Sequence, residues 1–233
     1  MDKRGLSHIE IIMSFVIFIG FLIFAFYFFN PLKADRVLDA SLYYTNDEIL
    51  KNVSVSLESY SVILGEPGGI SGPSGIVEIP LNATIEGDIK VRVENYNGVN
   101  LSASYSNNVV NFDSEGNDFV KIMFSEVFPE QSFINGGEAN YTIASSNIES
   151  LISEKRVLEL KDYYENSYPE LKAFFNIPNR IDFGFQIIFN ENDSIIAEKE
   201  IPQGIKVLVQ EKRIEVIREG GEIVFTDLII KVW

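Results

Sequence analysis

The sequence predicts an α+β protein, in which an N-terminal transmembrane helix is followed by a mostly antiparallel β exported domain with one or two helices. Three observations lead to this prediction. An uninterrupted apolar segment lies near the N-terminus, and short segments of alternating apolar and polar residues fill most of the remainder. A single strong helix-start pattern, Ser146-x-x-Glu149, interrupts the alternation. The chain of 233 residues can form one or two domains with a sizeable core.

The apolar segment is long enough to cross a bilayer. At about 1.5 Å per residue, Ile11 to Phe29 spans roughly 28 Å as a helix, which is close to the hydrocarbon thickness of a membrane. It lacks the polar stripe of a helix in a soluble core, and Pro31 follows where a helix can end at low cost. We therefore expect residues 6–33 to form a transmembrane helix in the lipid bilayer.

The flanks of this helix predict its orientation. Lys3 and Arg4 precede it, and a short basic segment tends to stay in the cytoplasm. We expect a single-pass protein of the cell membrane, with a cytoplasmic N-terminus and an extracellular domain from Ala34 onward. A removable secretory signal is not expected, because the apolar segment is too long and Leu32-Lys33-Ala34 is a poor cleavage site.

Residues 34–64 are predicted to form a stem and the first strand. Apolar residues recur at helical spacing from Val37 to Leu50, whereas Val53 to Leu57 alternates with serine as a half-buried strand does. The alternation changes register near Ser59, which predicts a β-bulge or a bend.

Residues 65–137 are predicted to be a β-rich lobe. Gly65 to Gly75 is rich in Gly and Pro and is expected to be a loop or hinge. Asn97-Gly98 is expected to form a tight hairpin turn between two alternating segments, and Phe119 to Phe128 is expected to add another strand.

Residues 138–233 are predicted to form a second lobe, which combines helices with a β-hairpin. The capping-box pattern at Ser146 predicts a helix that runs to about Asn166, and a shorter helix is expected at 169–175. The aromatic pairs Tyr163-Tyr164 and Phe174-Phe175 are expected in the core. The strands expected here are 181–189, 213–219 and 222–233, of which the last two form a hairpin across Gly220-Gly221.

The composition argues against several classes of function. The net charge of −15 disfavours nucleic acid as a partner, because the phosphate backbone would be repelled. Without Cys there is no thiol nucleophile or Cys-ligated zinc, and a single histidine, His8, cannot build a multi-histidine metal site. The sequence carries no nucleotide-binding motif and no catalytic constellation, so we expect neither an enzyme nor a cofactor.

Two kinds of polar site remain as candidates. Five Asn-x-Ser/Thr sequons follow the apolar helix and are candidates for glycosylation, at Asn52, Asn82, Asn100, Asn140 and Asn192. Asp113, Glu115 and Asn117 place oxygen atoms at the alternate spacing of a calcium loop, but Phe occupies position 124, where the bidentate Glu belongs. A solvated turn is therefore favoured over a calcium site.

The residues before the apolar helix form the most specific pattern. Lys3-Arg4-Gly5 is followed by Leu6-Ser7-His8-Ile9-Glu10 and then directly by the apolar segment. This arrangement resembles the N-terminal signature of type IV pilins and pilin-like proteins, in an archaeal style. The resemblance covers only this segment and the apolar helix, and Leu6 and His8 depart from the residues usual in that family.

The resemblance implies a role for each of these residues. A prepilin peptidase would cut after Gly5, so that residues 1–5 are a class III signal peptide and Leu6 is the first mature residue. The Glu10 carboxylate would pair with the amino group of Leu6 in a neighbouring copy and set the stagger between packed helices. A second interpretation is that Ser7-x-x-Glu10 is only a capping box at the start of an anchoring helix.

Two classes of function are consistent with these patterns. The first is a pilin-like structural or interaction protein, such as a minor subunit of a type IV pilus-like filament or of a related secretion or adhesion system at the cell surface. Its partners would be the prepilin peptidase and self or other pilin-like subunits. The alternative is a monomeric single-pass membrane protein that displays an extracellular β-rich binding domain. Cleavage after Gly5 and self-assembly distinguish the two.

Overall fold

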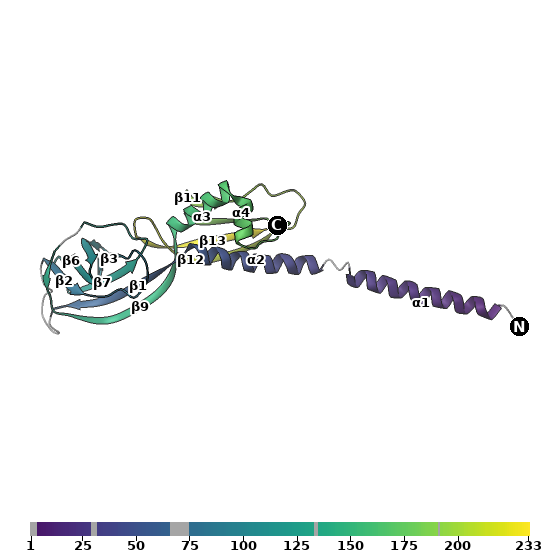
Figure 1. The fold of residues 1–233 in the computed structure, drawn as a ribbon, viewed down its shortest axis with the longest axis horizontal. Coiled ribbons are helices and arrows are strands. Elements are labelled where there is room, and N and C mark those ends of the chain that lie inside the picture. Colours follow the sequence, from purple (N-terminus) through teal and green to yellow (C-terminus); the bar gives the residue numbers. More distant parts are fainter. Residues whose placement is uncertain (1–3, 29–31, 66–74, 133–134, 191) are drawn as a thin grey trace.

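The computed structural model describes residues 4–28, 32–65, 75–132, 135–190 and 192–233. The architecture is α+β, as predicted: an apolar N-terminal helix precedes a mostly antiparallel sheet domain with a few helices (Figure 1). The helices are α1 (Arg4–Phe28), α2 (Leu32–Val53), α3 (Glu154–Asn166) and α4 (Tyr168–Phe174). The strands are β1 (Ser54–Leu64), β2 (Ile76–Pro80), β3 (Lys90–Asn95), β4 (Asn100–Leu101), β5 (Ala103–Ser106), β6 (Val109–Asp113), β7 (Phe119–Ser125), β8 (Gly137–Glu138), β9 (Tyr141–Ser153), β10 (Phe183–Asn190), β11 (Asp193–Ala197), β12 (Leu208–Ile217) and β13 (Ile223–Val232).

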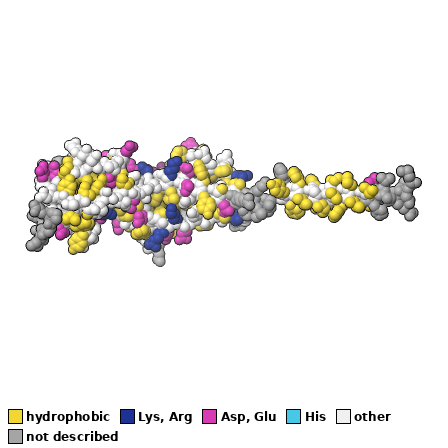
Figure 2. All heavy atoms as spheres, turned by 90° about the horizontal axis from the view of Figure 1, so that it is seen from below, with side chains coloured by type: hydrophobic (Ala, Val, Ile, Leu, Met, Phe, Trp, Pro, Cys, Tyr) yellow, Lys and Arg dark blue, Asp and Glu magenta, His cyan; other side chains and the backbone are white. Residues whose placement is uncertain are grey.

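Helix α1 lies apart from the rest of the chain, which we call the head (α2 to β13; Figure 1). The segment Ile9–Tyr27 has a mean hydropathy of 2.7 and is not buried, so it is long and apolar enough to cross a membrane. Figure 2 shows hydrophobic side chains along α1, whereas acidic and basic side chains are scattered over the head. A helix that is apolar all round suits a lipid environment.

Helix α2 continues directly into the first strand. It ends at Val53 and β1 begins at the next residue, which confirms the predicted stem helix followed by a strand. Leu42, Ile49 and Val53 recur at helical spacing and are at most 8% exposed, because this face of α2 packs on the sheet.

The head is organised around one nine-stranded sheet with the order β11-β10-β13-β12-β9-β1-β7-β3-β4. Neighbouring strands are antiparallel except β9 and β12, which run parallel and pair only at Val216↔Ile152 and Ile217↔Ser153. The register of β1 and β9 shifts between Ser61 and Val62. A change of register was predicted within β1, and the structure places it two residues beyond Ser59.

The half of the head far from α1 is a sandwich. Strands β9, β1, β7, β3 and β4 belong to one layer, and a four-stranded sheet with the order β5-β6-β2-β8 forms the other. Val62, Val93 and Ile122 from the first layer meet Ile79 and Phe112 from the second, and all five side chains are fully buried. The sequence predicted a β-rich lobe here, and the stacking of two sheets is a finding of the structure.

The half of the head near α1 has helices on one face of its strands. Phe183, Phe185 and Ile187 alternate along β10 and are at most 2% exposed, and they share a core with α2, α3 and α4. On the opposite face, Val209 and Phe225 are 56% and 62% exposed. Each predicted aromatic pair is only half in the core: Tyr164 and Phe175 are buried, whereas Tyr163 and Phe174 are 37% and 59% exposed.

Two predicted hairpins are confirmed. Asn97-Gly98 lies between β3 and β4, where the Gly98 N–H donates to the Asn95 carbonyl and Gly98 has a φ of +76°. The turn between β12 and β13 contains Gly220-Gly221, and Gly221 has a φ of +82°. Glycine suits both positions because it adopts a positive φ at little cost.

The prediction of a helix that begins at Ser146 is wrong. Residues 146–153 are the second half of β9, and α3 begins only at Glu154. The reason is that β9 pairs with β1 along its whole length, from Tyr141↔Leu64 to Ile152↔Ser54, and this pairing outweighs a local capping pattern. The true N-cap is Ser153, whose hydroxyl accepts a hydrogen bond from the Arg156 N–H at 3.3 Å.

The predicted lobes 65–137 and 138–233 share one sheet. Strands β3, β4 and β7 come from the first, and β9 to β13 come from the second. The predicted loop from Gly65 to Gly75 lies outside the described residues except at its two ends.

Candidate functional site

The N-terminal segment that resembles the pilin signature is helical from Arg4. Lys3 lies outside the described residues, and Gly5 and Leu6 form part of the first turns of α1. The capping-box interpretation of Ser7-x-x-Glu10 is therefore wrong, because Ser7 lies inside the helix instead of preceding it.

Glu10 is exposed near the start of the apolar span. It is the single charged residue between Ile9 and Tyr27. A carboxylate at the edge of a bilayer core is costly unless it is paired or reaches the interface, which makes it a candidate for a functional contact.

The sequons differ in accessibility. Asn82, Asn100, Asn140 and Asn192 are exposed on the head. Asn52 is different, because it is half-buried in the last turn of α2 and its side-chain amide donates to the Glu48 carbonyl at 2.7 Å. The structure thus separates four accessible candidates from one that is occupied by a helix contact.

The calcium candidate is a turn between β6 and β7. The Asp113 carboxylate accepts a hydrogen bond from the Glu115 N–H at 3.1 Å, and the Asn117 side-chain amide donates to the Ser114 carbonyl at 2.8 Å. Among the described residues, no group of three or more Asp, Glu or His side chains is placed to hold a metal ion.

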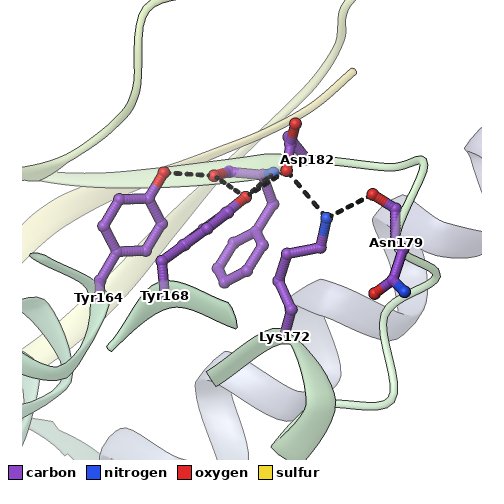
Figure 3. Close-up of polar contacts among 6 residues, drawn as sticks. Tyr164, Tyr168, Lys172, Asn179 and Asp182 are labelled. Atoms are coloured by element: carbon purple, nitrogen blue, oxygen red, sulfur yellow. Dashed lines mark hydrogen bonds and ion pairs between the residues drawn. The ribbon is translucent and has the colours of Figure 1, made fainter. Parts of the chain in front are cut away.

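A polar cluster that the sequence did not indicate joins α4 to β10 (Figure 3). The Lys172 ammonium group donates to Oδ1 of Asp182 and to the Asn179 carbonyl, both at 2.9 Å. The Tyr168 hydroxyl donates to the same Asp182 oxygen at 2.9 Å and accepts from the Phe183 N–H at 3.0 Å. The Tyr164 hydroxyl donates to the Phe183 carbonyl at 2.6 Å.

The electrostatics of this cluster favour the charged aspartate. Burial alone would raise the pKa of Asp182, but hydrogen bonds from Lys172 and Tyr168 outweigh it and hold the pKa below its usual value. Burial raises the pKa of Tyr168, so its hydroxyl stays protonated and able to donate. The Lys199 ammonium group lies 3.4 Å from the centre of the Tyr168 ring. The cluster links α3 and α4 to the start of β10 through hydrogen-bond donors and acceptors that pair with one another.

A buried carboxylate lies in the sandwich. Glu58 on β1 is 2% exposed and accepts hydrogen bonds from the Tyr60 hydroxyl at 2.6 Å and from the Thr84 N–H at 2.6 Å. Burial alone would raise its pKa, yet the hydrogen bonds from Tyr60 and Thr84 hold it below its usual value. Burial and Glu58 together raise the pKa of Tyr60 to about 12. These contacts hold the segment after β2 against β1.

Comparisons of this chain with protein-family models, with curated proteins and with solved structures found no match. Its function must therefore be inferred from its own residues and their arrangement.

Proposed function

We propose that the chain is a membrane-anchored, pilin-like structural protein, a subunit of a type IV pilus-like filament or of a related secretion or adhesion system. Glu10 is the observation that carries the proposal. It is a lone carboxylate at the start of a fully exposed apolar helix, one residue after Ile9 and five positions after the glycine of the basic leader. A free amino group at Leu6 of a neighbouring copy would neutralise it.

The shape of the molecule supports this function. The apolar helix projects from the head, and in this proposal it passes from lipid into the core of an assembly (Figure 1). A helix that contacts copies of itself through different faces forms an open, heterologous assembly. Val37, Tyr44 and Pro178 help to line an apolar groove of about 480 Å³ at the base of the head, which would contact a neighbouring copy.

Mass spectrometry of the N-terminal peptide from native membranes tests the processing step. A chain that begins at Leu6 supports cleavage by a prepilin peptidase. A chain that retains Lys3-Arg4-Gly5 contradicts it, and favours a monomeric anchored protein with an extracellular binding domain.

The role of Glu10 is tested by Glu10→Ala beside a matched control, Ser14→Ala, which lies one turn further along α1. We expect Glu10→Ala to insert into the membrane normally but to be lost from sheared surface filaments, whereas Ser14→Ala is incorporated. Equal incorporation of both variants into filaments would contradict the pairing of Glu10 with Leu6.

The orientation has its own test. Protease added to intact cells is expected to degrade the chain beyond Ala34. Protection of that region until the cells are lysed would reverse the topology.

A further inference from the structure

The end of the head that faces α1 is formed by two loops and the C-terminal residue. The loop 176–182 connects α4 to β10, and the loop 198–207 connects β11 to β12. Both lie beside the first turns of α2, and in Figure 1 the β11–β12 loop reaches almost to the level at which α2 begins. We call these two loops and Trp233 the base of the head.

A hollow of about 380 Å³ opens at this base and combines apolar and basic side chains. They belong to Leu38, Arg180, Pro202, Ile205, Lys206 and Trp233. Ile205 is 44% exposed, whereas Trp233 is 7% exposed and forms part of the wall. The hollow therefore offers an apolar surface with cations beside it.

Two acidic residues of the same loops are engaged inside the head. Asp182 also lines the hollow, but its carboxylate pairs with Lys172 at 2.9 Å. Glu198 pairs with Lys231 at 2.8 Å. Glu200 is then the remaining acid of the two loops. The high net negative charge of the chain is therefore not concentrated at the base.

Charge is distributed unevenly along the head. Residues 54–150, which form most of the far half, contain 13 acidic and three basic residues. The rest of the chain contains 16 of the 19 basic residues. The phosphate groups of a bilayer surface would therefore repel the far half and would oppose the base least.

Continuity of the chain identifies the surface that the base meets. Leu32, where α2 begins, follows Tyr27 at the end of the apolar span by five positions, which is about 8 Å at the rise of a helix. The headgroup layer on each side of a bilayer is about 5–8 Å thick. A loop level with the start of α2 therefore lies at the outer edge of the headgroups, if α1 crosses the membrane.

We propose that the base of the head binds the phospholipid surface of the membrane that α1 crosses, with a lipid phosphate group in the hollow. The exposed Arg180 guanidinium donates to the phosphate oxygens, which match its planar fork, and Lys206 adds a second cation. Ile205 contacts the glycerol and upper acyl carbons, beside a tryptophan of the kind that is enriched at membrane interfaces.

This contact orients the head before any assembly. The base rests on the bilayer, and the acidic far half points away from it. The inference rests on the anchoring part of the proposed function, and it depends neither on cleavage after Gly5 nor on the pairing of Glu10.

Trp233 reports on the contact, because it is the single tryptophan of the sequence. The full-length chain is inserted into phosphatidylcholine vesicles that contain a lipid with a spin label on its headgroup, which quenches nearby indole fluorescence. We expect strong quenching in the native chain and severalfold less in Ile205→Glu. Ile196→Glu on β11 is the matched control, because Ile196 is also 44% exposed, and it should be quenched like the native chain.

The phosphate contact is tested separately from the apolar contact. Arg180→Gln, a change at an exposed residue, should reduce the quenching to a level between those of the native chain and Ile205→Glu. Inorganic phosphate in excess should leave the quenching of the native chain unchanged, because free phosphate lacks the glycerol and acyl carbons. Loss of quenching on addition of phosphate would assign the hollow to the free anion and overturn the lipid contact.

The remaining outcomes separate this proposal from the proposed function. Weak quenching of the native chain, or equal quenching of Ile205→Glu and Ile196→Glu, would overturn the lipid contact alone. Glu10→Ala should be quenched like the native chain, so its incorporation into filaments is an independent result. Flotation with the vesicles verifies insertion, and a native chain that does not float would contradict both the anchor and this contact.

Discussion

Lys172 and Asp182 form an ion pair in which the two partners are unequally buried. The lysine side chain is 7% exposed and the aspartate side chain is 42% exposed, with 2.9 Å between Nζ and Oδ1. The buried cation therefore depends on the aspartate, whereas the aspartate can also be solvated by water.

This asymmetry predicts unequal effects of the two neutral substitutions. Asp182→Asn leaves the buried ammonium group without its counter-charge and should cost about 2–3 kcal/mol of unfolding free energy. Lys172→Met removes the buried charge and should cost about 1 kcal/mol. Thermal unfolding of the full chain in detergent measures both. Glu165→Gln, which disrupts an exposed pair with Lys161, should change stability by no more than about 0.5 kcal/mol, and equal losses at 172 and 182 would contradict the asymmetry.

The buried Glu58 predicts a loss of stability in acid. Its pKa in the folded chain lies below the ordinary value of 4.5, so folding favours the ionised form. The contribution is complete above pH 4.5 and is lost as the pH falls from there through the folded pKa. We expect the stability difference between the native chain and Glu58→Gln to be constant near neutral pH and to shrink below pH 4.5. A difference that stays constant in acid would refute this prediction.

The N-cap of α3 predicts that Ser153 contributes more to stability than Ser146 does. Ser153→Ala removes the hydroxyl that accepts from the Arg156 N–H and should cost about 1 kcal/mol. Ser146→Ala lies in an exposed strand and should change stability by no more than about 0.5 kcal/mol. Denaturant unfolding measures the loss of stability in each variant. A larger loss for Ser146→Ala than for Ser153→Ala would indicate that the helix begins at Ser146.

The five sequons are expected to differ in use. Glycopeptide mapping of the native protein should find any glycans at the exposed residues Asn82, Asn100, Asn140 and Asn192, and none at Asn52. The half-buried amide of Asn52 donates to the Glu48 carbonyl within α2, so a glycan there would have to displace this contact. A glycan on Asn52 would contradict this prediction.

Elements with strong local signals could be predicted from the sequence. The apolar helix, the stem and the Asn97-Gly98 hairpin depend on residues close together in the chain, so their patterns are visible without the fold. Residues 146–153 show the limit of prediction from local patterns. Their serine and glutamate satisfy a local helix-start pattern, but a partner strand about 90 residues earlier decides their structure, as the Glu149↔Leu57 pairing shows.

The candidate sites also differ in whether their residues are close together in the chain. The Glu10 pattern is contiguous and readable, whereas the cluster of Tyr168, Lys172 and Asp182 forms only when α4 packs against β10. Lys172 alone would be interpreted as a solvated helix residue. The one available signal was the i, i+4 spacing of Tyr168 and Lys172 on a short helix, which places both on one face. The hollow at the base of the head could not be predicted, because it depends on how residues 198–207 and Trp233 lie beside α2.

The absence of any loop between α2 and β1 has a mechanical consequence. A pull on helix α1 would pass through α2 into β1 at Ser54, an interior strand of the sheet. Because β1 is hydrogen-bonded lengthwise to β9 and β7, tension along it would shear both ladders at once and would not unzip them one bond at a time. The head is therefore built to bear tensile load along its long axis, and force applied at the tip should stretch the stem before it separates the central strands.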